Sequence, residues 1–185
     1  MTLRMKAKIW VAGWILCLSQ LGMADSAPQC LAYGWNLPVN NSQVLHWERT
    51  TPNQFQERAH IQGTLIQIYP SQNGHDHIQV QIGNSPDQTI EVIYNEDFGA
   101  TPSLYVGMSV EACGDYITST AQSGPYPPSP DGAILHWVHL NPRGRGHDPG
   151  FLVLDGTLCG QDAEHAGPPR YEDSSGLARH RWRDR

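Results

Sequence analysis

Six short segments rich in Ile, Val, Leu, Thr and Tyr fill most of the chain between residues 61 and 158, and they limit what it can fold into. The chain also has 18 glycines and 14 prolines, many of them between these segments. Short β-prone runs separated by turn residues are typical of sheets and do not suit long helices. The sequence therefore predicts an all-β protein with strands at Ile61–Tyr69, His77–Ile82, Gln88–Tyr94, Ser109–Tyr116, Ala133–Leu140 and Phe151–Leu158.

Apolar and polar residues alternate strictly from His77 to Ile82. Successive side chains of a strand point to opposite faces, so one face of this strand is buried and the other is solvated. The predicted buried residues are Ile78, Val80 and Ile82, and the predicted solvated ones are His77, Gln79 and Gln81. Five or six such short strands without a long amphipathic helix predict a small OB-like β-barrel.

These strands divide the chain into four parts. We predict a signal peptide at 1–24, an irregular N-terminal segment at 25–59, the β-barrel domain at 60–160 and a disordered C-terminal tail at 161–185. In the N-terminal segment the only candidate helical turns are Gln43–Arg49 and Asn53–Arg58. The tail is predicted to be disordered because it has almost no large apolar residue, and its last seven residues carry a net charge of +3.

The first 24 residues have the features of a secretory signal. Three basic residues come first, the mainly apolar run Ile9–Leu21 follows, and Gly22 and Ala24 are the small residues before the cleavage site. Only 16 residues separate Lys8 from Asp25, which is short of the roughly 20 needed to span a bilayer. We therefore expect a periplasmic or secreted protein with no transmembrane anchor after cleavage.

Cys30, Cys113 and Cys159 remain after cleavage, in a compartment where disulfides persist. Three cysteines allow one disulfide and one free thiol, and three pairings are possible. We favour Cys113–Cys159, because both lie on or beside predicted strands whereas Cys30 lies in the N-terminal segment. A cysteine-ligated zinc site is not expected, because the sequence has no Cys-x-x-Cys or Cys-x-x-His spacing.

The mature chain is strongly acidic, with 9 arginines and no lysine against 18 Asp and Glu residues. A net charge of −9 disfavours nucleic acid as a partner. The lack of lysine excludes Schiff-base chemistry and a P-loop.

Histidines carry the strongest chemical signal. His75 and His77 are two residues apart and so project to one side of a strand, and a second window holds three more. Imidazoles grouped in this way predict a site for zinc or another divalent metal, with the ligands His77, His136, His139 and His147.

Residues three apart on a regular strand point to opposite faces, so His136 and His139 can share an ion only if the strand ends or bulges between them. Pro142 permits such an end, because it has no amide hydrogen for a sheet. The alternative is that both histidines are polar strand residues, bonded to the backbone or packed beside Trp137.

Charged residues next to the second window suggest a reaction. Arg143 and Arg145 are candidates to hold a phosphate or another anion, and Asp148 or a histidine could move protons. A metal-activated water would then hydrolyse a phosphate or related ester. The alternative is a solvated glycine-arginine surface loop.

Two blocks of the chain resemble a family of small secreted bacterial proteins filed as domain of unknown function 3465. They are Gly107-Met-Ser-Val110 with Gly114-Asp115-Tyr116, and Gly132-Ala-Ile-Leu-His136-Trp137-Val-His139-Leu-Asn141-Pro142-Arg143. His77 and His147 match further histidines of the family. The chain departs from it at Asn141, where the family usually has an acid, and at Tyr94-Asn95, where it tends to have His-Asn, which removes up to two metal ligands. The resemblance implies export and a compact β domain, and it supplies no established activity.

Two functions therefore fit the sequence. The first is a histidine-rich metal site, with hydrolysis as its further step. The second is a non-catalytic envelope or extracellular binding module, whose solvated face holds a glycan, peptide or protein partner through Gln79, Gln81, Tyr94 and Trp137. The sequence does not identify the small molecule or envelope partner.

Overall fold

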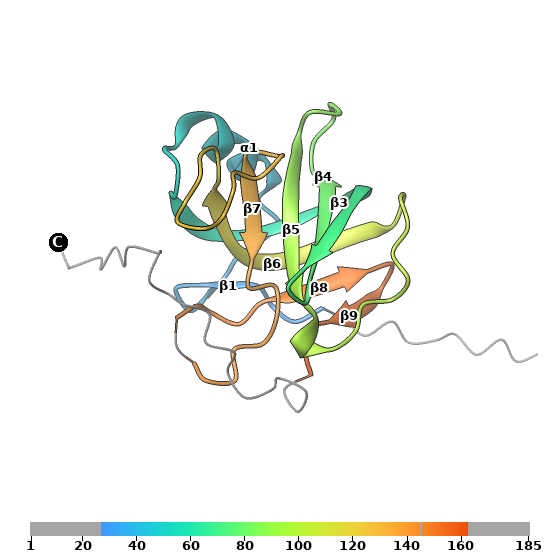
Figure 1. The fold of residues 1–185 in the computed structure, drawn as a ribbon. Coiled ribbons are helices and arrows are strands. Elements are labelled where there is room, and N and C mark those ends of the chain that lie inside the picture. The colour runs from blue at the N-terminus through green and yellow to red at the C-terminus, as the bar shows by residue number, and fades with distance from the viewer. Residues whose placement is uncertain (1–26, 145, 163–185) are drawn as a thin grey trace, which may run out of the picture.

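Seven strands of the described part of the chain form one large sheet (Figure 1). The computed structural model describes residues 27–144 and 146–162. Its elements are β1 (Leu31–Ala32), β2 (Trp35–Asn36), α1 (Asn41–Thr50), β3 (Gln56–Gln72), β4 (His75–Gln81), β5 (Thr89–Asn95), the 3-10 helix η1 (Glu96–Phe98), β6 (Ser109–Thr118), β7 (Ala133–His136), β8 (Phe151–Leu154) and β9 (Thr157–Cys159). The all-β class is confirmed. The predicted signal peptide and nearly all of the predicted tail lie outside the described residues.

Seven strands pair in the order β3-β4-β5-β7-β6-β8-β9, and β3 also pairs with β6. The contact of β5 with β7 is parallel, and the other contacts are antiparallel. Because β3 pairs with both β4 and β6, the sheet returns on itself as a partly closed ring (Figure 1). Strands β1 and β2 form a separate hairpin. No described helix has the length and apolar character to cross a membrane.

The predicted register of β4 is confirmed. Ile78, Val80 and Ile82 are buried in the core inside the ring, with exposed fractions of 2%, 0% and 6%. Burying these apolar side chains together with those of β5 and β6 stabilises the fold.

Three predicted elements differ from the structure. Strand β7 ends at His136 instead of Leu140. The segment Phe151–Leu158 is a hairpin instead of one strand, because Asp155 and Gly156 both have positive φ and form a two-residue turn between β8 and β9. The helical turn at Gln43–Arg49 is confirmed by α1, whereas the one at Asn53–Arg58 is wrong, because β3 begins at Gln56 and pairs there with β6.

The disulfide joins Cys30 to Cys113, and Cys159 is the free thiol of the described residues. The predicted Cys113–Cys159 pairing is wrong because β8 lies between β6 and β9. Cys159 packs into the main core, whereas Cys113 packs with Cys30 and Phe151 in a second cluster. The N-terminal segment is therefore fastened to β6 and is not an irregular leader.

Candidate functional site

The segment from His136 to Leu140 leaves the sheet at the end of β7 and positions the site. Trp137 has φ of 53°, a left-handed conformation that bulky residues rarely adopt. This residue interrupts the alternation of a strand, so His136 and His139 are not forced to opposite faces. The strand end that a shared site requires is present, although it lies at His136, six residues before Pro142.

Three glycines let other parts of the backbone approach this segment closely. A Cβ atom on Gly114 would overlap the carbonyl oxygen of His136, one on Gly150 would overlap that of Trp137, and one on Gly160 would lie 2.8 Å from that of Val138. The amide of Gly150 also donates to the carbonyl of His139 at 2.7 Å. The segment is thus held between β6 and the chain that runs into β8 and out of β9.

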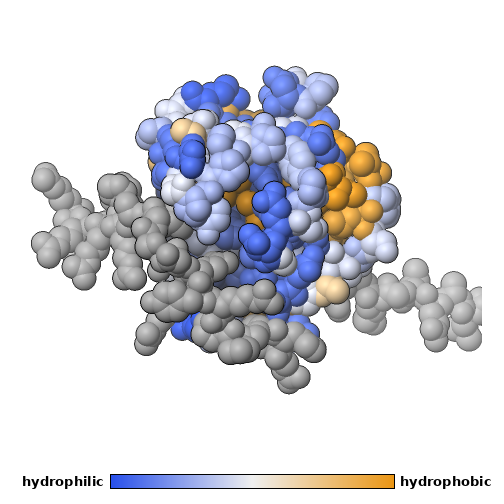
Figure 2. All heavy atoms as spheres, in the orientation of Figure 1, coloured by the Kyte–Doolittle hydropathy of each residue, from blue (hydrophilic) through white to orange (hydrophobic). Residues whose placement is uncertain are grey.

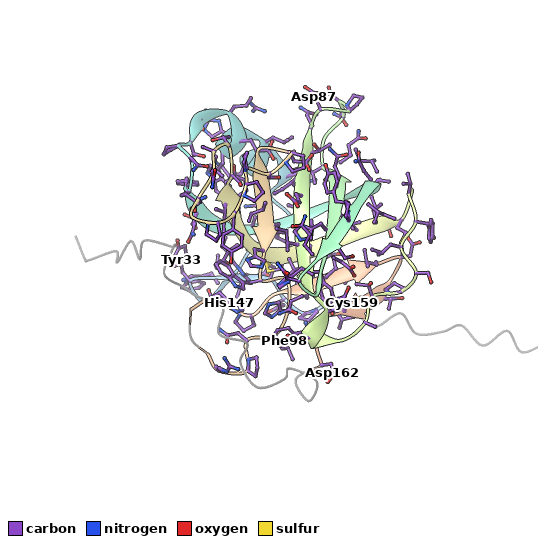
Figure 3. The ribbon with its side chains drawn as sticks, viewed as in Figure 1. Tyr33, Asp87, Phe98, His147, Cys159 and Asp162 are labelled. Atoms are coloured by element: carbon purple, nitrogen blue, oxygen red, sulfur yellow. A yellow bond between two sulfur atoms is a disulfide. The ribbon has the colours of Figure 1, made fainter. Side chains whose placement is uncertain are left out.

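Imidazole and aromatic rings gather beside this segment. The Trp137 ring lies between two histidines, with its centroid 4.7 Å from that of His136 and 5.4 Å from that of His147. His139 stacks on Phe98 of η1 at 3.7 Å and meets His147 edge to face at 5.2 Å. Figure 3 labels His147 and Phe98 in the lower part of the molecule, with Phe98 below and to the right of His147. Three of the four predicted ligands therefore lie in one cluster.

Backbone carbonyl groups fix the tautomers of two of these histidines. Nδ1 of His139 donates to the carbonyl of Leu140 at 2.6 Å, and Nδ1 of His147 donates to the carbonyl of Asp148 at 2.8 Å. A carbonyl oxygen only accepts, so the proton of each neutral ring is on Nδ1 and the lone pair is on Nε2. Among the described residues, no group is hydrogen-bonded to either Nε2 atom.

Burial keeps the clustered histidines neutral. It lowers the pKa of His139 to about 4, and it also lowers the pKa of His147. The pKa of His136 is lowered to about 3, first by burial and then by the positive charge that His75 and the other nearby imidazoles would carry. Neutral imidazoles are the form that binds metal ions.

His75, rather than His77, is the β4 histidine nearest to His136. The ring centroids of His75 and His136 are 6.0 Å apart. Nδ1 of His77 instead lies 2.7 Å from Oε1 of Glu91, whose other oxygen accepts a hydrogen bond from Ser129. His77 is thus part of a hydrogen-bonded chain on the outer face of β4 and β5.

The loop before β7 covers the face that was predicted to bind a partner. Gln79 donates to Asp131 at 2.5 Å, and Thr89 donates to the same carboxylate oxygen at 2.5 Å. Tyr94 was expected on this face, but it is fully buried inside the ring and donates to the carbonyl of Gly99. It points inward because it shares the buried face of β5 with Ile90 and Val92.

Of the residues predicted to act on a substrate, Asp148 lies beside the cluster, since its charge raises the pKa of His147 against the lowering by burial. Arg143 and Asp148 are exposed, and Arg145 lies outside the described residues. The guanidinium of Arg58 is close enough to lower the pKa of His147. It is buried and donates to Asp115 at 2.7 Å, to the carbonyl of Leu31 at 3.1 Å and to the carbonyl of Pro149. It fastens the chain after His147 to the rest of the fold.

The rings are close, but they do not form a complete metal site. Within residues 27–144 and 146–162, no three His, Cys, Asp or Glu side chains are arranged to hold one ion. Two imidazoles that share a zinc ion have ring centroids about 5–6 Å apart, given a Zn–N distance of about 2.0–2.1 Å. The spacing of His139 and His147 fits that range, so these two rings could share an ion. No third side chain of the described residues is in position, so another ring would have to turn to complete the site.

Sequence reasoning missed the structural partners of the cluster. Arg58 lies 78 residues before His136, and Phe98 lies 41 residues before His139. No local sequence pattern identifies either residue as part of the site. A signal for His75 was present, because it shares a strand face with His77.

Comparison of the chain with family models, curated proteins and solved structures finds no match. The resemblance to domain of unknown function 3465 therefore stays a prediction.

Proposed function

We propose that the histidine cluster binds a divalent transition metal, with His139 and His147 as the first two ligands. The carrying observation is that both rings donate Nδ1–H to a backbone carbonyl, which leaves the lone pair on Nε2. Metal-binding histidines in proteins usually have this support, because the Nδ1 bond fixes both the tautomer and the ring direction. Zinc is the usual partner of imidazole ligands.

A third ligand would come from a turn of the His136 or the His75 ring. Their ring centroids are 6.0 Å apart, and His136 lies against the Trp137 ring. The lowered pKa values of His136 and His139 mean that neither ring must lose a proton at neutral pH before it binds.

Hydrolysis of a phosphate or related ester is a further step of this proposal. A bound zinc ion with an open position supplies an activated water. The charge of Asp148 already acts on His147. Arg143 would have to approach from the exposed loop that carries it, since Arg58 is already engaged by carbonyl groups and Asp115.

The setting of the site is proposed to be an OB-like barrel in an exported protein. The ring order β3-β4-β5-β7-β6, with its parallel β5–β7 contact, supports an OB-like topology. The Cys30–Cys113 disulfide supports a periplasmic or secreted location.

Zinc titration of the metal-free, untagged mature protein by calorimetry tests the proposal. We expect a dissociation constant below about 10 μM, or roughly 7 kcal/mol of binding free energy, and at least a tenfold loss in His147→Ala. The matched control is His46→Ala, whose exposed side chain on α1 lies outside the cluster. Weaker binding by the wild type, or equal losses in both variants, contradicts the proposal.

A binding module is the second candidate, now on a different surface. Tyr33 and Trp35 of the β1–β2 hairpin are 80% and 79% exposed, and large aromatic side chains of this kind hold glycans or peptides. The pKa of Tyr33 is raised, first by its hydrogen bond to Glu57 and then by partial burial. The charges of Asp115 and Asp148 raise it further, so both carboxylates lie near this hairpin. Chelator-insensitive ligand binding that is lost in Trp35→Ala would favour this candidate.

A further inference from the structure

A pocket of about 550 Å³ opens where β3, β4 and the chain after η1 meet. Its lining combines an apolar wall with a polar end. The apolar residues are Ile68, Ala100, Pro102 and Leu104, and the polar ones are Ser71, Asp76, Glu96 and Thr101. Figure 2 shows a hydrophobic patch on the side of the molecule where Figure 1 places β3 and the loop before β6. Ile68 in the pocket lining is 42% exposed, and Tyr105 and Val106, which follow the lining residue Leu104, are 55% and 62% exposed.

Two carboxyl groups lie side by side at the polar end. Asp76 accepts hydrogen bonds from Ser71 and Thr101, each at 2.9 Å, so its carboxylate is fixed in place. The pKa of Glu96 is raised, first by a hydrogen bond to Asp76 and then by the charge of Asp76. The raised pKa shows that the negative charge of Asp76 disfavours a second negative charge on Glu96. A guanidinium between the two carboxylates would relieve this repulsion, because it is positively charged and offers several N–H donors to carboxylate oxygens.

The chain itself supplies a fitting ligand. Its last seven residues, Arg179-His-Arg-Trp-Arg-Asp-Arg185, contain four arginines and a tryptophan. The described part of the chain has 13 Asp and Glu residues against three arginines, so the charges are complementary.

The tail also starts beside the pocket. The amide of Asp162, the last described residue, donates to the carbonyl of Phe98 at 3.3 Å, and Figure 3 shows the two together. Phe98 is two residues from Ala100 in the pocket wall. The 17 residues from Ala163 to Arg179 can extend to about 55 Å, so the tail is long enough for its end to reach the pocket. A tether of this kind makes binding effectively intramolecular.

We propose that the Arg179–Arg185 segment docks into this pocket of the same chain, with one arginine between Asp76 and Glu96 and Trp182 against the apolar wall. Docking would cover the exposed apolar patch and neutralise the paired carboxylates. It is independent of the metal proposal.

Fluorine NMR of the full mature chain labelled with 5-fluorotryptophan tests this docking. The signal of Trp182 is assigned by its loss in Trp182→Phe. At low salt we expect it to be shifted and broadened relative to 1 M NaCl, where charge pairing is screened. Glu96→Gln should reduce the salt-sensitive shift at least twofold, and so should the tail variant Arg181→Gln/Arg183→Gln, which leaves every described residue unchanged.

Two controls make the result specific. Asp87→Asn removes an exposed carboxylate at the opposite end of the molecule (Figure 3), and Arg170→Gln removes an arginine outside the docking segment. Both should leave the Trp182 signal unchanged. Equal effects of Glu96→Gln and Asp87→Asn would overturn the proposal, and so would a Trp182 signal that does not respond to salt. A shift that grows with protein concentration would show docking between copies, which overturns docking within one chain.

Discussion

Removing the Cys30–Cys113 disulfide should destabilise the protein more than any other change of similar size. The two cysteines are 83 residues apart in the sequence, so the bond closes a large loop in the unfolded chain. In the chain-entropy description, a loop of this length corresponds to about 4–5 kcal/mol at 25 °C. That value is a large fraction of the stability of a typical domain, which is roughly 5–15 kcal/mol.

The expected fall in melting temperature follows from the size of the folded part. The structure describes 135 residues, and unfolding gains about 2.1 cal/mol/K for each residue. A loss of about 4 kcal/mol then lowers the melting temperature by roughly 14 °C. The assay compares thermal and urea unfolding of Cys30→Ala/Cys113→Ala with the oxidised wild type, and reduction of the wild type should reproduce the change.

The control for lost volume is Cys159→Ala, which removes a buried thiol and keeps the disulfide. It should lower the stability by no more than about 2 kcal/mol. If the reduced wild type melts within about 3 °C of the oxidised protein, the N-terminal segment does not depend on the bridge and the reasoning fails.

Three further outcomes are expected. His139 has a pKa of about 4 in the folded protein and about 6.5 in the unfolded one, so its contribution to stability is complete above pH 6.5 and falls by roughly 3 kcal/mol as the pH drops to 4. A plot of the urea midpoint against pH should be flatter for His139→Gln than for the wild type and unchanged for His46→Gln. Equal slopes in all three proteins would contradict this. Gly150→Ala should lower the free energy of unfolding in urea by more than about 3 kcal/mol, because the added Cβ overlaps two carbonyl oxygens. Gly144→Ala, where the Cβ has open space but φ is positive, should lower it by about 1 kcal/mol. Similar losses in the two variants would refute the close approach at Gly150. In the mature chain, which lacks Cys17, Ellman's reagent should find no reactive thiol in the native state and one in denaturant, because Cys159 is buried and burial raises its pKa to about 11. Rapid labelling of the native protein would contradict the placement of Cys159.

The parts of the fold that depend on local pattern could be predicted from the sequence. The alternation in β4 predicts its register, because burial of Ile78 and Val80 leaves only one choice of face. The hairpin of β8 and β9 also had a local signal, the Asp155-Gly156 pair, which is typical of two-residue turns.

The parts that depend on distant contacts could not be predicted. The pairing of Cys30 requires the strand order, which places β8 between Cys113 and Cys159. The left-handed conformation of Trp137 is fixed by the backbone that approaches it at Gly114 and Gly150, from elements far away in the sequence. The candidate site shares this limit, since the histidine pattern identified three members of the cluster but not their packing against Phe98.

Arg58 links the oxidation state of the protein to its histidine cluster. Its guanidinium donates to the carbonyl of Leu31, the residue after Cys30, and to that of Pro149, two residues after His147. While the disulfide is open, nothing covalent keeps Leu31 in reach, and Arg58 loses one of the partners that hold it in place. Under reducing conditions the cluster would therefore be held more loosely, and closing the disulfide would tighten it without any change in the histidines themselves.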